Sequence, residues 1–186
     1  MSTTAMIVLA VLVLLLVWTI SLYNNLVRKK NYMSEAWSGI DVFLKKRYDL
    51  LPNLVETVKG YAAHEKKVLD DLTAMRTQAM QAGSPADKMQ SEQGLSRALG
   101  SLMAVAENYP DLKASANFQQ LQKDLYGIES ELESARRYYN ATVRENNMLI
   151  EGFPSGIIAN LFHFQKGVFF ELDKNADYMQ TPKVSF

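Results

Sequence analysis

The feature that most constrains this chain is an apolar stretch without a charged residue, AMIVLAVLVLLLVWTISLY, from Ala5 to Tyr23. Its length matches the roughly 20 residues that a helix needs to cross the hydrocarbon core of a membrane. A cleaved signal peptide is the alternative, but the stretch lacks a preceding basic segment and continues into Asn24 without an A-x-A-like cleavage site. We therefore expect an uncleaved transmembrane helix.

The residues around this stretch predict its orientation. Trp18 and Tyr23 suit a membrane interface, where an aromatic ring stays in apolar surroundings while its polar edge meets water. Arg28, Lys29 and Lys30 follow at once, whereas the residues before the stretch include no lysine or arginine. By the positive-inside rule, we expect a single-pass protein with its N-terminus outside and most of its chain in the cytoplasm.

Composition excludes several classes of function. The chain has 186 residues, which suits one domain with an anchor. Its 20 lysines and arginines balance 20 aspartates and glutamates, so net charge gives no reason to expect a nucleic-acid partner. There is no cysteine, which excludes disulfides, thiolate catalysis and cysteine-bound metals.

Beyond the anchor, apolar residues recur at steps of three and four, the pattern of helices that bury one face. A first helix continues from the membrane, and Pro52 predicts a break or kink, because proline lacks an amide proton and disfavours helical geometry before it. A second helix is expected from Leu54 to Ala79, and a third from Ala86 to Asn108. The fourth has the steadiest spacing, and its seam comprises Phe118, Leu121, Leu125, Ile128, Leu132, Ala135, Tyr139 and Thr142.

No segment shows the period-two alternation of a strand, and no repeat unit is evident. The predicted fold is therefore all-α: an N-terminal transmembrane helix continues into an antiparallel bundle of about four long helices, followed by an aromatic-rich C-terminal tail. The expected divisions are residues 1–30 for the anchor and basic segment, 31–152 for the bundle, and 153–186 for the tail.

The search for a catalytic or metal site yields none. His64 and Glu65 begin like a zinc-protease HExxH helix, but position 68 is valine, so the second histidine is missing. Glu129, Glu131 and Glu133 diverge around a helix and are expected on a solvated face beside arginines. We predict no enzyme activity, no cofactor and no bound metal.

Several runs of sequence together resemble the LemA family of bacterial membrane proteins. They are YNNLV (23–27), AWSGIDV (36–42), LKKRYDLLPNLV (44–55), VKGY (58–61), His64-Glu65, AENYPDLK (106–113), FQQLQ (118–122), RRYYN (136–140) and FPS (153–155). The resemblance implies an anchor in the bacterial cytoplasmic membrane and a helical-bundle domain. It implies no reaction, so it supplies no catalytic residues.

Two clusters invite functional hypotheses. The charged residues Lys45, Arg47, Asp49 and Glu65 are candidates for structural ion pairs, with contact to lipid headgroups or another subunit as the alternative. The tail is rich in apolar and aromatic residues that either cap the bundle or contact a neighbouring subunit or the membrane. These candidate assembly or membrane contacts are Phe153, Ile157, Ile158, Leu161, Phe162, Phe164, Phe169 and Phe170.

Together these features predict a membrane-anchored helical scaffold that self-associates and organises or remodels the bacterial membrane. The alternative is an adaptor or sensor that docks on another membrane protein, such as a membrane peptidase. The expected partners are the lipid bilayer and further copies of the chain, with another membrane protein under the alternative.

Overall fold

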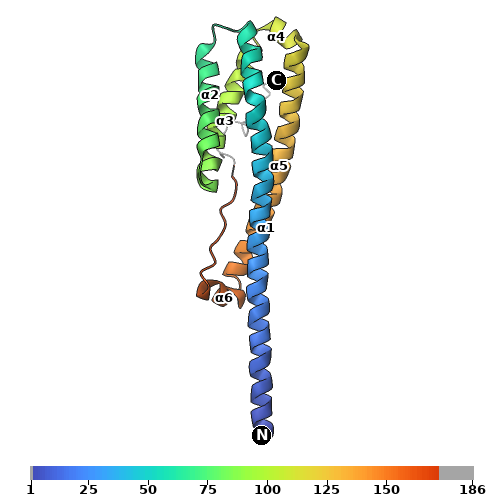
Figure 1. Cartoon of the computed structure of the whole chain (residues 1–186), viewed down its shortest axis with the longest axis vertical. Coiled ribbons are helices and arrows are strands. Elements are labelled where there is room, and N and C mark those ends of the chain that lie inside the picture. Colours follow the sequence, from blue (N-terminus) through green and yellow to red (C-terminus); the bar gives the residue numbers. More distant parts are fainter. Residues whose placement is uncertain (1, 172–186) are drawn as a thin grey trace, which may run out of the picture. The chain divides into compact units, whose positions relative to one another are not determined.

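The apolar stretch is the first part of one long helix, α1 (Thr3–Tyr61), in the computed structural model, which describes residues 2–171 (Figure 1). The other helices are α2 (Lys66–Gln81), α3 (Pro85–Ala106), α4 (Pro110–Ala114), α5 (Ala116–Glu151) and α6 (Ser155–Leu161). The described residues contain no strand, which confirms the predicted all-α class. Helix α1 is also the one described helix that is long and apolar enough to cross a membrane.

Of the break or kink predicted at Pro52, the break does not occur. Pro52 lies inside α1, and the break falls instead between Tyr61 and Lys66, where His64 and Glu65 are found. A proline inside a helix removes the hydrogen bond that its amide would donate to the carbonyl four residues earlier, here that of Tyr48. The guanidinium of Arg76 replaces that donor, since its Nε donates to the Tyr48 carbonyl oxygen at 2.7 Å.

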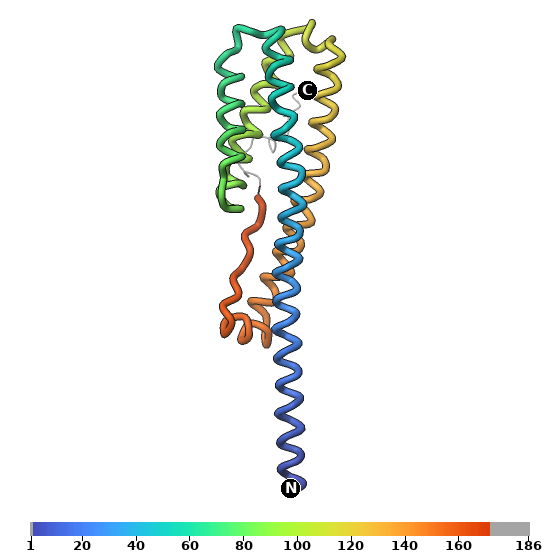
Figure 2. Tube along the Cα trace, viewed as in Figure 1, coloured from blue at the N-terminus to red at the C-terminus, as the bar shows by residue number. Residues whose placement is uncertain are grey.

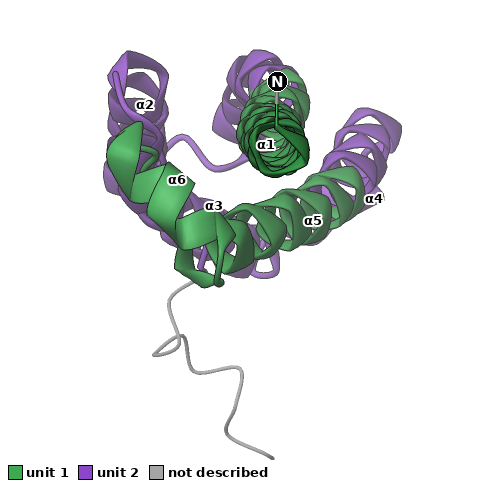
Figure 3. Ribbon diagram, turned by 90° about the horizontal axis from the view of Figure 1, so that it is seen from below, with its two compact units in different colours: residues 1–44, 130–169 green, residues 45–129, 170–186 purple. Residues whose placement is uncertain are grey.

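The chain divides into two compact units, which Figure 3 colours separately. Unit 1 comprises Met1–Leu44 and Ser130–Phe169, and unit 2 comprises Lys45–Glu129 and Phe170–Phe186. The part of the expected 153–186 tail beyond residue 171 lies outside the described residues.

Unit 2 is built from the last part of α1, helices α2 to α4 and the first part of α5. Helices α2 and α3 form a hairpin whose turn ends where Ser84 caps α3: its Oγ accepts a hydrogen bond from the Asp87 amide at 3.1 Å. The unit's core is made of leucines with no exposed surface, namely Leu51, Leu54, Leu72, Leu95, Leu102 and Leu112.

Unit 1 places part of α1 beside the last part of α5 in antiparallel directions. Lys29 Nζ lies 2.6 Å from Glu145 Oε2, and further along α1 the ring of Trp37 meets that of Tyr139 edge-on at 5.4 Å. After α5 the chain turns into the short helix α6 and then runs without regular structure to Phe169, as the tube in Figure 2 shows.

The segment after α6 packs back onto these two helices. The rings of Phe162 and Phe164 meet that of Tyr23 at 4.8 and 5.8 Å, the Gly167 amide donates to Asn147 Oδ1 at 2.8 Å, and Tyr139 donates to the Val168 carbonyl at 3.0 Å. These contacts hold residues 162–168 along α1 and α5. This described part of the tail therefore belongs to the fold of unit 1.

Candidate functional site

A buried arginine is the most strongly partnered charged residue in unit 2. Arg47, on α1, is 1% exposed; its Nη1 lies 2.7 Å from Glu92 Oε2 on α3, and its Nε lies 2.8 Å from Glu129 Oε1 on α5. Its Nη2 donates to Ser96 Oγ at 3.0 Å. The arginine thus joins three helices of unit 2.

The second oxygen of Glu92 accepts a short hydrogen bond from the hydroxyl of Tyr48. Glu92 is 1% exposed, so both of its carboxylate oxygens have partners inside the protein. A buried charge is tolerated when it is paired and hydrogen-bonded in this way. Since neither Arg47 nor Glu92 meets solvent, a substrate has no access to them, and we interpret this Arg47 centre as structural.

The other predicted ion-pair residues lie elsewhere. Lys45 and Asp49 are exposed and form no ion pair among the described residues. Residues two apart point to divergent sides of a helix, so both face outward when Arg47 faces the core. The predicted partners of Arg47, which included Asp49 and Glu65, are therefore corrected to Glu92 and Glu129.

Glu65 has a neutral partner in place of the expected cation. Its Oε1 accepts a hydrogen bond of 3.1 Å from the hydroxyl of Tyr109. Desolvation first, and then this hydrogen bond and the negative charge of Glu65, raise the pKa of Tyr109 above its usual value. Tyr109 therefore remains a hydrogen-bond donor at neutral pH.

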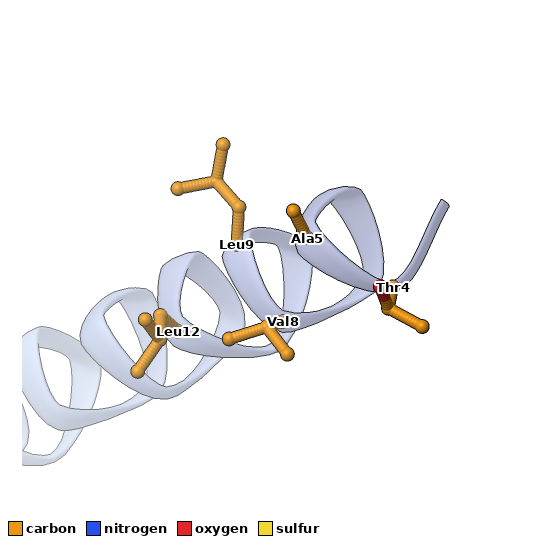
Figure 4. Close-up of a pocket in the computed structure, with 5 residues that line it drawn as sticks. All are labelled: Thr4, Ala5, Val8, Leu9 and Leu12. Atoms are coloured by element: carbon orange, nitrogen blue, oxygen red, sulfur yellow. The ribbon is translucent and has the colours of Figure 1, made fainter. Parts of the chain in front are cut away.

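Within the described residues we find no group of side chains suited to a metal ion, and the one pocket drawn lies on the apolar stretch. No three histidine, aspartate or glutamate side chains gather to form a metal site within residues 2–171. His64 and His163 are both exposed and belong to different units. The pocket drawn in Figure 4 is lined by five residues of α1 alone, Thr4, Ala5, Val8, Leu9 and Leu12. It is a hollow on the surface of the apolar stretch.

The apolar residues of the tail separate into two groups. Ile158 and Phe164 pack against a small core of Leu26, Ile150 and Ala159, and Phe170 is buried in unit 2. The others keep much of their surface exposed: Phe153 88%, Ile157 60%, Leu161 67%, Phe162 51% and Phe169 37%.

The fold and these sites define a class: a helical protein whose N-terminal helix is apolar enough to span a membrane and whose buried charges stabilise the fold. Within that class, the chain belongs to the LemA family, whose model matches residues 36–186. The predicted family is thereby confirmed.

Individual relatives are distant. The chain is 24% identical over 175 residues to magnetosome protein MamQ 2 of Paramagnetospirillum magneticum, a match that covers 80% of this chain and 64% of that protein. It is 24% identical over 174 residues to MamQ of Magnetospirillum gryphiswaldense, with the same coverages. It is also 27% identical over 139 residues to protein LemA of Metamycoplasma hominis, covering 73% of this chain and 63% of the relative. The chain thus spans less than two thirds of the length of these relatives, and their names state no reaction.

Sequence reasoning missed two important residues, Glu92 and Arg76. The sequence carries a signal for Glu92, because it continues the three-four spacing of the buried α3 residues Leu95, Leu99, Leu102 and Ala106. A glutamate in such a stripe requires a buried partner. Arg76 had no comparable signal, because its acceptor is a backbone carbonyl on another helix. Glu129, which was expected on a solvated face, keeps 32% of its side chain exposed and also contacts Arg47.

Proposed function

We propose that this protein is a membrane-anchored helical scaffold that self-associates and so organises or remodels the bacterial membrane. One observation carries the proposal: α1 is a single helix of 59 residues that contains both the apolar stretch and core residues of the helical units. No loop separates the apolar stretch from the part of α1 that packs against α5, so the anchor and unit 1 share one continuous helix. Relationship to LemA and MamQ proteins supports membrane association.

Self-association needs a surface that the single chain leaves open. The predicted seam of α5 is not such a surface, because most of its residues are already buried within the chain. The buried ones are Phe118, Leu121, Leu125, Leu132 and Tyr139. Large side chains do remain exposed on the parts of α1 and α5 that belong to unit 1. They are Tyr32 (43%), Val42 (54%), Tyr138 (58%) and Met148 (58%). We assign contacts between copies to these helix faces.

The proposal is tested by measuring the mass of the particles that the full chain forms when it is extracted with its own lipids. A scaffold gives particles containing several chains of 21.0 kDa each. Particles with one chain would contradict self-association and favour the adaptor, which needs no second copy. Recovery of a single chain bound to another membrane protein would support the adaptor directly.

A matched pair of variants locates the contact. Val42→Glu combined with Tyr138→Glu places charges at exposed apolar positions, so we expect smaller particles with unchanged helical content. Ser34→Glu combined with Ser130→Glu adds the same charge at exposed polar positions two turns away and about 80° around the same helices, and should change the particle size much less. Equal effects of the two pairs would contradict the assignment to these faces.

The orientation of the anchor is part of the proposal. The basic residues Arg28, Lys29 and Lys30 favour a cytoplasmic bundle. Because the chain has no cysteine, Ser134→Cys creates a single thiol on α5. In intact cells this thiol should resist a membrane-impermeant maleimide and react only after lysis. Labelling before lysis would place the bundle outside.

A further inference from the structure

We propose that α6 and the residues beside it form an interfacial foot, whose exposed apolar face lies in the headgroup region of the same bilayer that α1 spans. The foot comprises residues 153–162, and its outward face is Phe153, Ile157, Leu161 and Phe162. This inference uses the membrane anchor alone and does not depend on self-association.

The first argument is the position of the foot along α1. The ring of Phe162 lies 4.8 Å from that of Tyr23, and Ala159 packs in one core with Leu26. Figure 1 shows α6 beside α1. Tyr23 is the last residue of the apolar stretch, where the helix leaves the hydrocarbon. At a rise of about 1.5 Å per residue, Leu26 is only about one helical turn further on. The foot therefore lies at the level of the membrane surface.

The second argument is the chemistry of the helix. A helix that packs on a soluble protein buries an apolar stripe and presents polar residues to water. In α6, Ala159 and Ile158 pack inward, yet Ile157 is 60% and Leu161 67% exposed on the outward side. Residues 152–165 contain no lysine, arginine, aspartate or glutamate. A helix that is apolar on both sides requires a second apolar surface.

The third argument is the charge that borders this segment. Lys166 Nζ and Glu151 Oε1 form an ion pair of 2.5 Å at the two ends of the uncharged segment and together carry no net charge, whereas the basic residues Arg28 and Lys30 are exposed on α1. Basic groups beside an apolar face suit a bilayer, because they meet anionic headgroups while the apolar groups enter by about 5–10 Å. Continuity with the membrane-spanning stretch makes lipid, rather than a second copy, the occupant that we assign.

The foot gives the protein a second contact with the membrane. The tilt of a single membrane-spanning helix is not fixed by the helix itself. It depends on packing against neighbouring elements and on residues that anchor at the interface. Contact of both α1 and α6 with one bilayer would fix the direction in which unit 1 leaves the membrane. The foot is then an orienting element of the anchor.

Single-cysteine variants of the full chain test the foot. Ile157→Cys and Leu161→Cys place a spin label on the outward face, and Ser134→Cys, on the exposed side of α5 in unit 1, is the control. Each variant is reconstituted in vesicles of phosphatidylethanolamine and phosphatidylglycerol, and its helical content is checked by circular dichroism. Oxygen, which concentrates in lipid, and a water-soluble nickel chelate then compete to relax the label.

We expect labels at positions 157 and 161 to show an oxygen-to-nickel accessibility ratio several-fold above that of the label at position 134. Equal ratios would place the face in water and overturn the proposal. Protection from both reagents would mean that a second copy or another protein covers the face, which also overturns it. Because particle mass is measured separately, a failed foot with a multi-chain particle leaves the scaffold intact, and a lipid-bound foot on a single chain overturns only the scaffold.

Discussion

The Arg47 centre of unit 2 buries charged side chains, whereas the foot of unit 1 exposes apolar ones. Each arrangement is unfavourable in water unless the side chains have suitable partners. In unit 2, a charged arginine and a charged glutamate are each 1% exposed, and each has partners within the chain. In unit 1, Phe153 is 88% and Leu161 67% exposed without comparable cover.

The difference separates structural features from functional ones. A buried charge with its partners in place needs nothing further, so the Arg47 centre is explained by folding. Exposed apolar groups on a helix without charges are not explained by folding, because the fold leaves them in water. The foot is therefore the region that we propose contacts the lipid bilayer.

Loss of Glu92 should lower the free energy of unfolding more than any other change proposed here. The Arg47 centre is structural only if removal of this partner destabilises the fold. Glu92→Ala leaves Arg47 buried with Glu129 as its remaining acidic partner, and removal of one partner from a buried pair costs about 3–5 kcal/mol. Glu129→Ala should cost less, since that side chain is 32% exposed. Urea unfolding followed by circular dichroism measures both changes in free energy.

A double variant that removes both charged partners shows how much of the loss comes from leaving Arg47 without Glu92. Arg47→Met combined with Glu92→Leu replaces the pair with apolar groups. It should recover part of the stability that Glu92→Ala loses, because no Arg47 charge remains buried, although the Tyr48 hydroxyl still lacks its Glu92 acceptor. If Glu92→Ala is as stable as the parent protein, the Arg47 centre is not a structural element and its interpretation fails.

Arg76→Ala tests whether the hydrogen bond from Arg76 to the Tyr48 carbonyl compensates for the amide proton that Pro52 lacks. The variant removes the donor to the Tyr48 carbonyl, and loss of a charged hydrogen-bond partner costs about 1–3 kcal/mol. In a Pro52→Ala background the amide of residue 52 can serve that carbonyl, so the same Arg76→Ala change should cost less. Equal costs in both backgrounds, measured by thermal or urea unfolding, would rule out the proposed compensation for Pro52.

Gly156→Ala tests how closely α6 is held in unit 1. A Cβ at this position would lie 2.9 Å from the backbone oxygen of Ile150, so α6 must shift, at a cost of about 1–3 kcal/mol. Gly39→Ala is the control, because a Cβ there meets nothing within 4 Å and replaces a flexible residue inside a helix, a gain of about 0.5–1 kcal/mol. Urea unfolding should show opposite signs, and a stabilising Gly156→Ala would mean that α6 is not held as described.

Tyr139→Phe should have the smallest effect, about 1 kcal/mol, from the lost hydrogen bond to the Val168 carbonyl. Burial raises the pKa of Tyr139 above its usual value near 10. The native state therefore holds this proton more tightly than the unfolded state, so the contribution is present below pH about 10 and is lost as pH rises through the folded pKa. The stability difference between Tyr139→Phe and the parent should shrink in strong alkali; a constant difference would contradict the pKa shift.

The sequence predicted what depends on local periodicity. The apolar stretch was evident as a run of residues without charge, and the α5 stripe was evident because apolar residues such as Leu125 and Leu132, which are buried, recur at regular steps. The uninterrupted course of α1 through Pro52 was not predictable, because it depends on a hydrogen bond from Arg76, which lies 28 positions from its acceptor. The foot was visible only as a concentration of apolar residues. Which of them face inward depends on how α6 packs on Leu26 and Ile150, a tertiary contact without a sequence pattern.

Imaging the full chain in its native lipids tests the scaffold account most directly. The account predicts particles that contain several copies, each with α1 entering the bilayer and α6 at its surface. Isolated single chains, with α6 held away from the lipid, would contradict it.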